Sequence, residues 1–260
     1  MKLPLYQVDA FTSRVFAGNP AAVVPLERWL DDDTLQKLAA ENNLSETAFL
    51  VGGSGDYQIR WLTPAAEVDL CGHATLASAW IVFNRLEPGL GEVTFRSKSG
   101  PLRVTAEGER LALDFPSRAP EPAEASLAAV AAALGARPAA LQASRDFLAV
   151  FEGEAEVRGL RPDMAKTAAL ERMAVIATAP GADCDFVSRF FAPGVGVPED
   201  PVTGSAHCTL VPYWSRRLGR KRLFARQVSA RGGELWCEDR GDRVSIAGCA
   251  ALFLEGTIVV

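Results

Sequence analysis

The chain has few of the residues that mark metal centres, disulfide frameworks or nucleic-acid surfaces. Only two histidines occur in 260 residues, and the five cysteines are scattered without paired spacing. This set predicts no metal site, and reduced thiols in a cytoplasmic protein are the expected interpretation. A net charge of −5 argues against nucleic-acid binding, which normally needs a basic face. No apolar run approaches the roughly 20 residues of a membrane span, and no signal-like apolar core is present.

The chain does contain a long, diverged repeat. Arg60–Pro64 leads through an acidic stretch to Cys71–Thr75 and then to an apolar run. Arg189–Pro193 leads in the same way to Thr203–His207 and a second apolar run. Such a repeat predicts two similar halves with a cleft between them, and the cleft is where chemistry is expected.

The domain boundary is expected in the Pro-rich stretch Pro116–Pro122, the best linker in the chain. It gives an N-terminal half of residues 1–117 and a C-terminal half of residues 118–250. The last strand, residues 251–260, could pair back onto the first half and complete it.

Each half has strands that run into a helix that is apolar on almost every side. The two helices are expected over residues 74–83 and 205–218. A helix of this kind is buried rather than amphipathic, so each sheet is expected to wrap around its helix. The prediction is an α+β fold of two rolled, mostly antiparallel sheets, and not a doubly wound parallel sheet.

The starts of these two helices carry the first candidate site residues. Gly72 and Gly204 expose backbone N–H groups that can hold a carboxylate or an enolate-like oxygen, although each could be an ordinary turn glycine. His73 can bond a ligand or merely cap the helix. Asp200 precedes a proline that favours extended geometry, so it can project toward the site or remain a loop acid. Ser205 can bind substrate or serve as a cap.

Two further residues are ambiguous from spacing alone. Glu46 lies between a helix and a strand, where it would be interpreted as a solvent-facing acid. Cys71 is either buried or reactive, and a free thiol at a helix start is expected to have a lowered pKa.

Five motifs together identify a resemblance that spans the whole chain. They resemble the PhzF-like family, named for a phenazine-biosynthesis isomerase: Asp9–Thr12, Phe16–Pro20, Asn43–Thr47, Leu70–Thr75 and Glu199–Ser205. The resemblance implies a diaminopimelate-epimerase-like fold with the active site between its halves, and often a homodimer. The characterised isomerase of this family shifts a proton within a cyclic dihydro-hydroxyanthranilate without a metal or an organic cofactor.

The resemblance also implies roles for individual residues. The family's acid/base glutamate matches Glu46, and its histidine and aspartate partners match His73 and Asp200. Its substrate-binding serine matches Ser205. The remaining expected substrate-binding residues lie in or beside the matched motifs: Asn19, Cys71, Gly72 and Gly204.

One departure bears on the type of reaction. Racemases and epimerases of this fold use two cysteines, one at each helix start. Cys71 stands where the first would stand, but the matching position in the second half is expected to be Asp200, and Cys208 is four residues into the helix. A two-thiol racemase is therefore not expected.

The sequence thus predicts a cofactor-independent isomerase that moves a proton within a small carboxylate-bearing metabolite. Two alternatives stay open. One is a racemase or epimerase that depends on Cys71. The other is a non-catalytic protein of the same fold that binds a metabolite or a partner.

Overall fold

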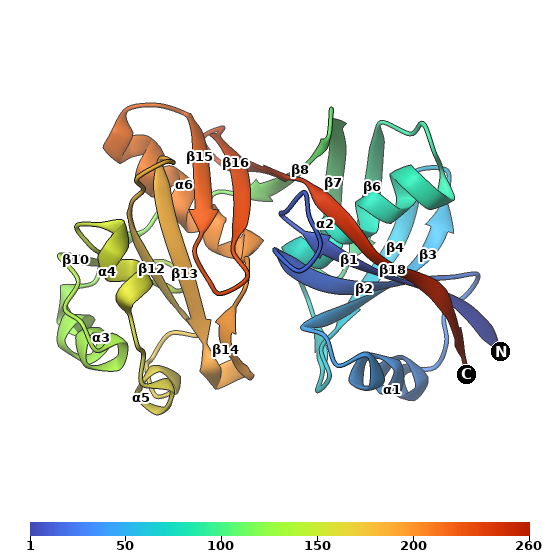
Figure 1. Ribbon diagram of the computed structural model, residues 1–260, viewed down its shortest axis with the longest axis horizontal. Helices are drawn as coiled ribbons and strands as arrows, with labels where there is room; N and C mark the ends of the chain where they lie inside the picture. The colour runs from blue at the N-terminus through green and yellow to red at the C-terminus, as the bar shows by residue number, and fades with distance from the viewer. The chain divides into compact units, whose positions relative to one another are not determined.

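The protein is described by a computed structural model that covers residues 1–260 (Figure 1). The chain forms two compact units: unit 1 comprises Met1–Asp114 and Ala247–Val260, and unit 2 comprises Phe115–Ile246. The boundaries thus lie a few residues before those expected from the linker and the last strand. No helix has both the length and the apolar character needed to cross a bilayer.

Unit 1 is built mainly from strands. Its elements are β1 (Lys2–Ala10), β2 (Asn19–Leu26), α1 (Asp32–Asn42), β3 (Glu46–Gly53), β4 (Asp56–Leu62), β5 (Glu67–Val68), α2 (Gly72–Ile81), a π-helical turn (Val82–Leu86), β6 (Glu92–Ser97), β7 (Gly100–Glu107), β8 (Arg110–Pro116) and β18 (Ala250–Val259). The last of these, β18, pairs antiparallel with β1 along its whole length.

Unit 2 has additional short helices. Its elements are β9 (Glu121–Pro122), α3 (Leu127–Leu134), β10 (Ala140–Ala143), β11 (Phe147–Val150), α4 (Glu154–Gly159), α5 (Met164–Ala168), β12 (Val175–Pro180), β13 (Phe186–Ala192), β14 (Val197–Asp200), α6 (Gly204–Leu218), β15 (Arg222–Gln227), β16 (Gly233–Asp239) and β17 (Arg243–Gly248).

The two sheets have the same order of strand directions. In unit 1, β1–β2 is antiparallel, β2–β3 parallel, β3–β4 antiparallel, β4–β6 parallel and β6–β7 antiparallel. In unit 2, the series β10–β11, β11–β12, β12–β13, β13–β15 and β15–β16 repeats these directions in the same order. The sequence repeat is therefore also a repeat of topology, and the α+β fold predicted from it is confirmed.

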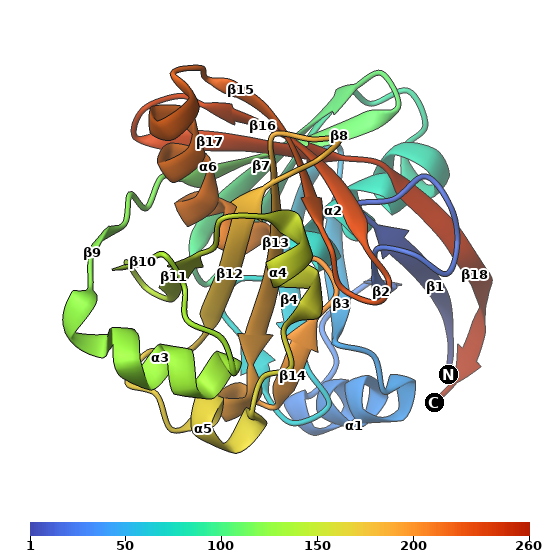
Figure 2. The same ribbon diagram turned by 60° about the vertical axis from the view of Figure 1, so that its left-hand side comes forward.

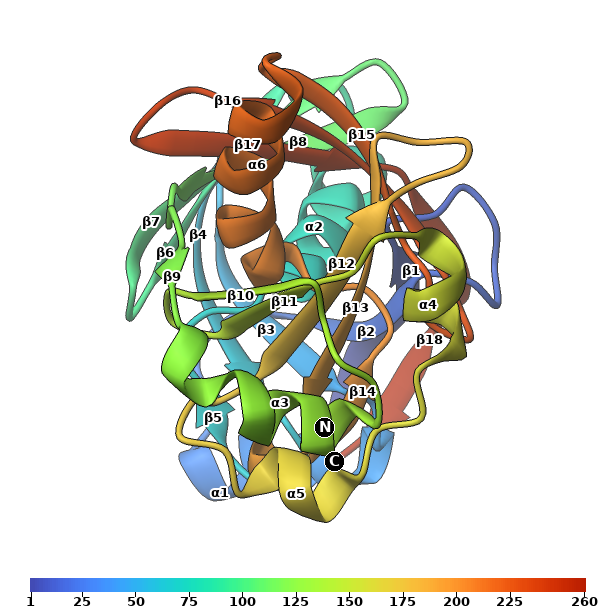
Figure 3. The same ribbon diagram turned by 90° about the vertical axis from the view of Figure 1, so that its left-hand side faces the viewer.

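Each unit contains one buried central helix. In α2 every residue except Trp80 is buried, and the helix contacts β1, β2 and β3. The other helix, α6, lies against β15 and β16 (Figures 2 and 3). Its Trp214 stacks on Phe186 of β13 with ring centroids 5.5 Å apart. The Trp214 indole also donates a hydrogen bond to Thr178 Oγ1 over 3.0 Å. Both helices thus lie in the apolar core of their own unit, as their composition predicts.

Two local predictions in unit 2 are wrong. The sequence pattern favours a helix over 163–173, but α5 ends at Ala168 and only Thr167 within it is buried. The sequence pattern also favours hairpins over residues 228–247, but β15 already starts at Arg222. The cluster of basic residues after α6 conceals the alternation of β15, whose inward residues are Leu223, Ala225 and Gln227.

Candidate functional site

The start of α2 brings Glu46 and His73 together. Glu46 is the first residue of β3, and His73 is the second residue of α2. His73 Nε2 lies 3.1 Å from Glu46 Oε2, and the two side chains are only 6% and 16% exposed. The interpretation of Glu46 as a solvent-facing acid is therefore wrong, because pairing of β3 with β2 and β4 carries it to the buried helix start.

Asn19, the first residue of β2, contacts the other side of the same imidazole. Asn19 Nδ2 lies 3.1 Å from His73 Nδ1, and both side chains are buried. Burial alone lowers the pKa of His73, but Cys71 and Glu46 together raise it well above its ordinary 6.5. The imidazolium form needs an acceptor at Nδ1, which the Asn19 amide supplies through its oxygen when the group rotates by a half-turn.

Cys71 is the residue immediately before α2. Its Sγ lies 3.5 Å from His73 Nδ1, and the residue is buried. Burial, followed by the charge of Glu46, raises the pKa of the Cys71 thiol to about 11 despite the opposing effect of His73. Of the two alternatives for Cys71, the structure supports the buried one and not the reactive one, and the raised pKa makes Cys71 a protonated thiol at neutral pH.

This gives a prediction for thiol chemistry. With a pKa of about 11, only about one Cys71 side chain in a thousand is a thiolate at pH 8. We expect iodoacetamide to modify the half-buried Cys249 well before Cys71, as measured by peptide mass spectrometry over time. Modification of Cys71 as fast as that of Cys249 would contradict this assignment.

Glu46, Cys71 and His73 also have the donor types of a metal site. Their ligand atoms all lie within 4.8 Å of one another. An ion held by all three would have to replace the direct contact between His73 and Glu46. The three groups also have the residue types of an acid/base site, because each can hold or release a proton.

The start of α6 in unit 2 repeats the backbone of the start of α2. Cys71 precedes α2 with φ −138° and ψ 111°, and Thr203 precedes α6 with φ −115° and ψ 99°. Relative to the helix start, the counterpart of Cys71 is thus Thr203 and not Asp200, which lies three residues earlier at the end of β14. The second unit places no thiol at this position.

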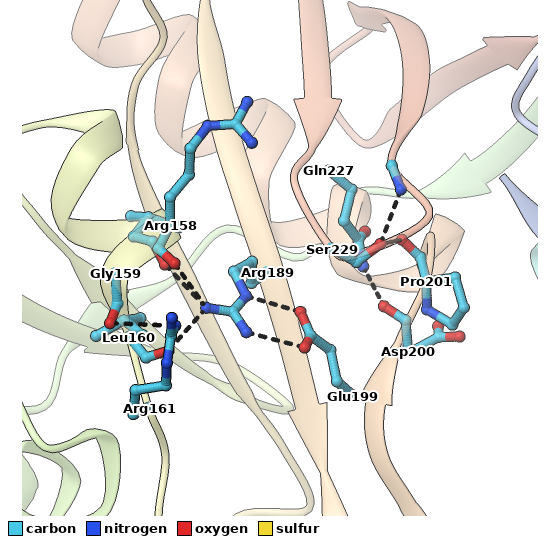
Figure 4. Close-up of polar contacts among 12 residues, drawn as sticks. Arg158, Gly159, Leu160, Arg161, Arg189, Glu199, Asp200, Pro201, Gln227 and Ser229 are labelled. Atoms are coloured by element: carbon cyan, nitrogen blue, oxygen red, sulfur yellow. Dashed lines mark hydrogen bonds and ion pairs between the residues drawn. The ribbon is translucent and has the colours of Figure 1, made fainter. Parts of the chain in front are cut away.

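Gln227 at the end of β15 holds the loop that carries Asp200. Its Nε2 donates to the Asp200 carbonyl over 2.7 Å, and its Oε1 accepts from the Thr203 amide over 2.8 Å. The Thr203 hydroxyl donates in turn to Asp200 Oδ2. Ser229 adds a hydrogen bond to the Pro201 carbonyl over 2.8 Å (Figure 4). Gln227 itself is only 1% exposed, and its bond to the Thr203 amide is buried and thus shielded from water.

The arginine that opens each copy of the repeat has the same structural role. Arg189 binds Glu199 through Nε and Nη2, at 2.7 and 2.9 Å (Figure 4). Arg60 binds Glu67 through the same two atoms, at 2.9 and 2.8 Å. Bidentate pairs of this kind fix the strand next to each site loop. Glu199 is therefore engaged in structure, whereas its neighbour Asp200 is held by the loop network.

Ser205 is not a helix cap. It is the second residue of α6, and its Oγ accepts a hydrogen bond from Arg145 Nη2 over 3.2 Å. Neither Arg145 nor Gln227 stands out in the sequence, because each lies in a separate segment with no motif of its own. The equivalence of the two halves is the one signal that could have directed attention to them.

His207 has a structural environment, as its place inside the second helix predicts. It is fully buried, and its Nδ1 lies 2.8 Å from the Thr203 carbonyl oxygen. Burial lowers the pKa of His207 to about 4, so the ring is neutral at neutral pH.

This burial predicts a pH dependence of stability. Unfolding exposes His207 and returns its pKa to about 6.5, so the unfolded state binds a proton more strongly. The neutral ring's contribution is present above pH 6.5 and is lost as the pH falls toward 4. Between pH 7 and pH 5 we expect the wild type to lose about 2 kcal/mol more than His207→Gln, measured by urea unfolding. Equal losses in the two proteins would contradict the assignment.

Comparisons with known proteins agree along the full length. A family model described as phenazine biosynthesis-like protein matches residues 8–256. An uncharacterized isomerase of Pseudomonas aeruginosa is 52% identical over 258 residues, which cover 99% of each chain. A human phenazine biosynthesis-like domain-containing protein is 41% identical and covers 99% of each chain. The crystal structure of a PhzF family protein from Enterococcus faecalis matches with a TM-score of 0.97 and 47% identity over the whole of both chains.

More distant structures share the fold alone. A hydroxyproline epimerase from Agrobacterium vitis matches with a TM-score of 0.60 at 10% identity, covering 99% of this chain and 92% of its own.

Proposed function

Because the chain belongs to the phenazine biosynthesis-like (PhzC-PhzF) family, we propose that it is an isomerase that moves a proton within a small carboxylate-bearing metabolite. The proposed chemistry is general acid/base catalysis that needs neither a metal nor an organic cofactor. The observation that supports it most strongly is the shielded contact between Glu46 and His73 at the start of α2.

In this proposal Glu46 removes a proton next to an activating group and returns it at another carbon. His73 holds the Glu46 carboxylate through the 3.1 Å contact, and Asn19 fixes the imidazole from behind. The N–H groups at Gly72, the first residue of α2, are proposed to stabilise the negative charge that develops during proton removal. Glu46 and His73 are thus proposed as the proton-handling pair.

Unit 2 is proposed to supply the second set of substrate contacts. Gly204 and Ser205 begin α6, whose first N–H groups suit a carboxylate. Asp200 is proposed to orient the substrate, and the hydrogen bonds from Thr203 and Gln227 fix its loop.

Two observations weigh against the alternative of a Cys71-dependent racemase. The Cys71 thiol has a raised pKa, which makes it a poor base at neutral pH. Its counterpart at the second helix start is Thr203, and Cys208 is buried inside α6. The largely buried contact between Glu46 and His73 weighs against the non-catalytic alternative.

Solvent deuterium exchange tests the proposed reaction. The protein is incubated in D₂O with 2,3-dihydro-3-hydroxyanthranilate, and with a panel of small cyclic and amino-acid carboxylates chosen by thermal stabilisation. We expect deuterium to enter one carbon while a double bond changes position, as followed by NMR. Carboxylates that bind and stabilise the protein without any exchange would favour the non-catalytic alternative. Deuterium entry at a stereocentre with inversion would favour the racemase.

Two further proposals concern assembly and location. A homodimer is proposed from the family resemblance, and sedimentation velocity tests it. A cytoplasmic location is proposed because none of the five cysteines forms a disulfide.

A further inference from the structure

Arg145, in the connection between β10 and β11, contacts the start of α6. Its Nη2 donates to Ser205 Oγ over 3.2 Å. Its Nε and Nη2 also bond Asp146 Oδ2, at 3.0 and 2.7 Å. The Asp146 side chain is 2% exposed and that of Arg145 is 33% exposed. The guanidinium is thus anchored on a buried carboxylate while one side of it reaches the helix start.

The topology gives this contact a counterpart in unit 1. The pair β10–β11 occupies the place that β1–β2 occupies in the other sheet, and β2 begins with Asn19. Asn19 contacts His73, the second residue of α2, just as Arg145 contacts Ser205, the second residue of α6. In both units, a side chain at or just before the start of the second strand thus contacts the second residue of the helix.

The polarity of the bond decides what Ser205 can do. A guanidinium has only donors, so the Ser205 oxygen must accept from Arg145 and its own hydrogen remains to be donated elsewhere. Asp146 compensates most of the charge of Arg145, so the main effect of Arg145 is orientation of the hydroxyl. A hydroxyl whose oxygen already accepts a hydrogen bond can donate its own hydrogen to a ligand atom that accepts hydrogen bonds. A carboxylate oxygen is such an acceptor, and its charge strengthens the bond.

We propose that Arg145 is a positioning residue that fixes the Ser205 hydroxyl as a donor to the carboxylate of the substrate. This rests on the proposed function, because it assigns the group that recognises the carboxylate there. Loss of Arg145 lets the hydroxyl rotate, which weakens binding of a carboxylate more than binding of a neutral amide of the same shape.

Paired ligands provide the test. Calorimetry gives the Kd of 3-hydroxyanthranilate and of 3-hydroxyanthranilamide for the wild type, Arg145→Gln, Ser205→Ala and the double variant. We expect the wild type to prefer the carboxylate by about tenfold or more, the gain of a charge-assisted bond. Arg145→Gln should lose most of this preference while its affinity for the amide changes little. In the Ser205→Ala background the same change should add no further loss, because both act through one hydroxyl.

Two controls separate recognition from folding. Arg222→Gln removes the same charge from a side chain that is 87% exposed and lies just after the C-terminal end of α6. This variant should leave both Kd values unchanged. Arg145→Gln combined with Asp146→Asn leaves no buried charge unpaired, and should show the same loss of preference if the single variant is unstable.

The outcomes distinguish the two proposals. A wild type that binds neither ligand, or both equally, contradicts the carboxylate substrate and with it the proposed function. A wild type that prefers the carboxylate, with variants that retain this preference, overturns the role of Arg145 alone. Full additivity of Arg145→Gln and Ser205→Ala would also overturn it.

Discussion

Glu46→Gln is expected to lower the rate of solvent deuterium exchange by about a hundredfold to ten-thousandfold, the range of a positioned general base. Glutamine keeps the size of the side chain and can still bond His73, whose Nε2 lies 3.1 Å from the carboxylate. It cannot take up and return a proton. The loss should therefore fall on kcat, while KM and the unfolding free energy change little.

A matched substitution on the same part of unit 1 provides the control. Glu41 lies near the end of α1, five residues before Glu46, and its side chain is exposed. Glu41→Gln should leave the exchange rate unchanged. An unchanged exchange rate in Glu46→Gln would contradict the assignment of Glu46 as the base. An equal loss of exchange rate in both variants would indicate a change in the fold.

Gln227→Leu is expected to combine a loss of stability with a loss of activity. Leucine has a similar volume but leaves the part-buried Asp200 carbonyl and the buried Thr203 amide without this partner. Each group left without a partner costs about 1–3 kcal/mol, so the unfolding free energy should fall by about 2–6 kcal/mol. Because the same bonds fix the Asp200 loop, kcat should fall by about tenfold to a hundredfold, the effect expected from misplaced groups.

Gln36→Leu is the corresponding control in unit 1. Gln36 on α1 makes one part-buried hydrogen bond, from Nε2 to the Thr63 carbonyl over 2.9 Å. Its loss should cost no more than about 1.5 kcal/mol, with kcat unchanged. If Gln227→Leu is destabilised but keeps its full kcat, the loop does not depend on Gln227 for its catalytic geometry.

Much of the fold could be predicted because it depends on local patterns. The repeat, the two apolar helices and most strands follow from periodicity, which burial imposes on each segment separately. The secondary-structure predictions were wrong where one segment carried conflicting local patterns. The basic residues before β15 conceal an alternating strand, and α5 ends early because only Thr167 in it is buried.

The candidate site residues could be predicted from the sequence only where they lie in a motif of the family. The spacing around Glu46 suggests an exposed acid, and the resemblance alone gives it a role. Gln227 and Arg145 lie in no recognisable motif. Each contacts a residue at least 24 positions away in the sequence, so no local pattern indicates the contact. The same holds for the Cys71 thiol. The sequence predicts its position at a helix start, but it does not predict that the thiol is buried and has a raised pKa.

The sequence by itself therefore determined that the chain has two equivalent halves, a buried helix in each, and unlike residues at the two helix starts. Tertiary structure alone decided which side chains meet there. The pairing of β2 and β3 brings Asn19 and Glu46 to His73, and the strands of unit 2 bring Arg145 to Ser205 and Gln227 to Asp200. The physical reason is that periodicity reports burial one segment at a time, whereas hydrogen-bond partners and pKa shifts depend on groups that strand pairing brings together.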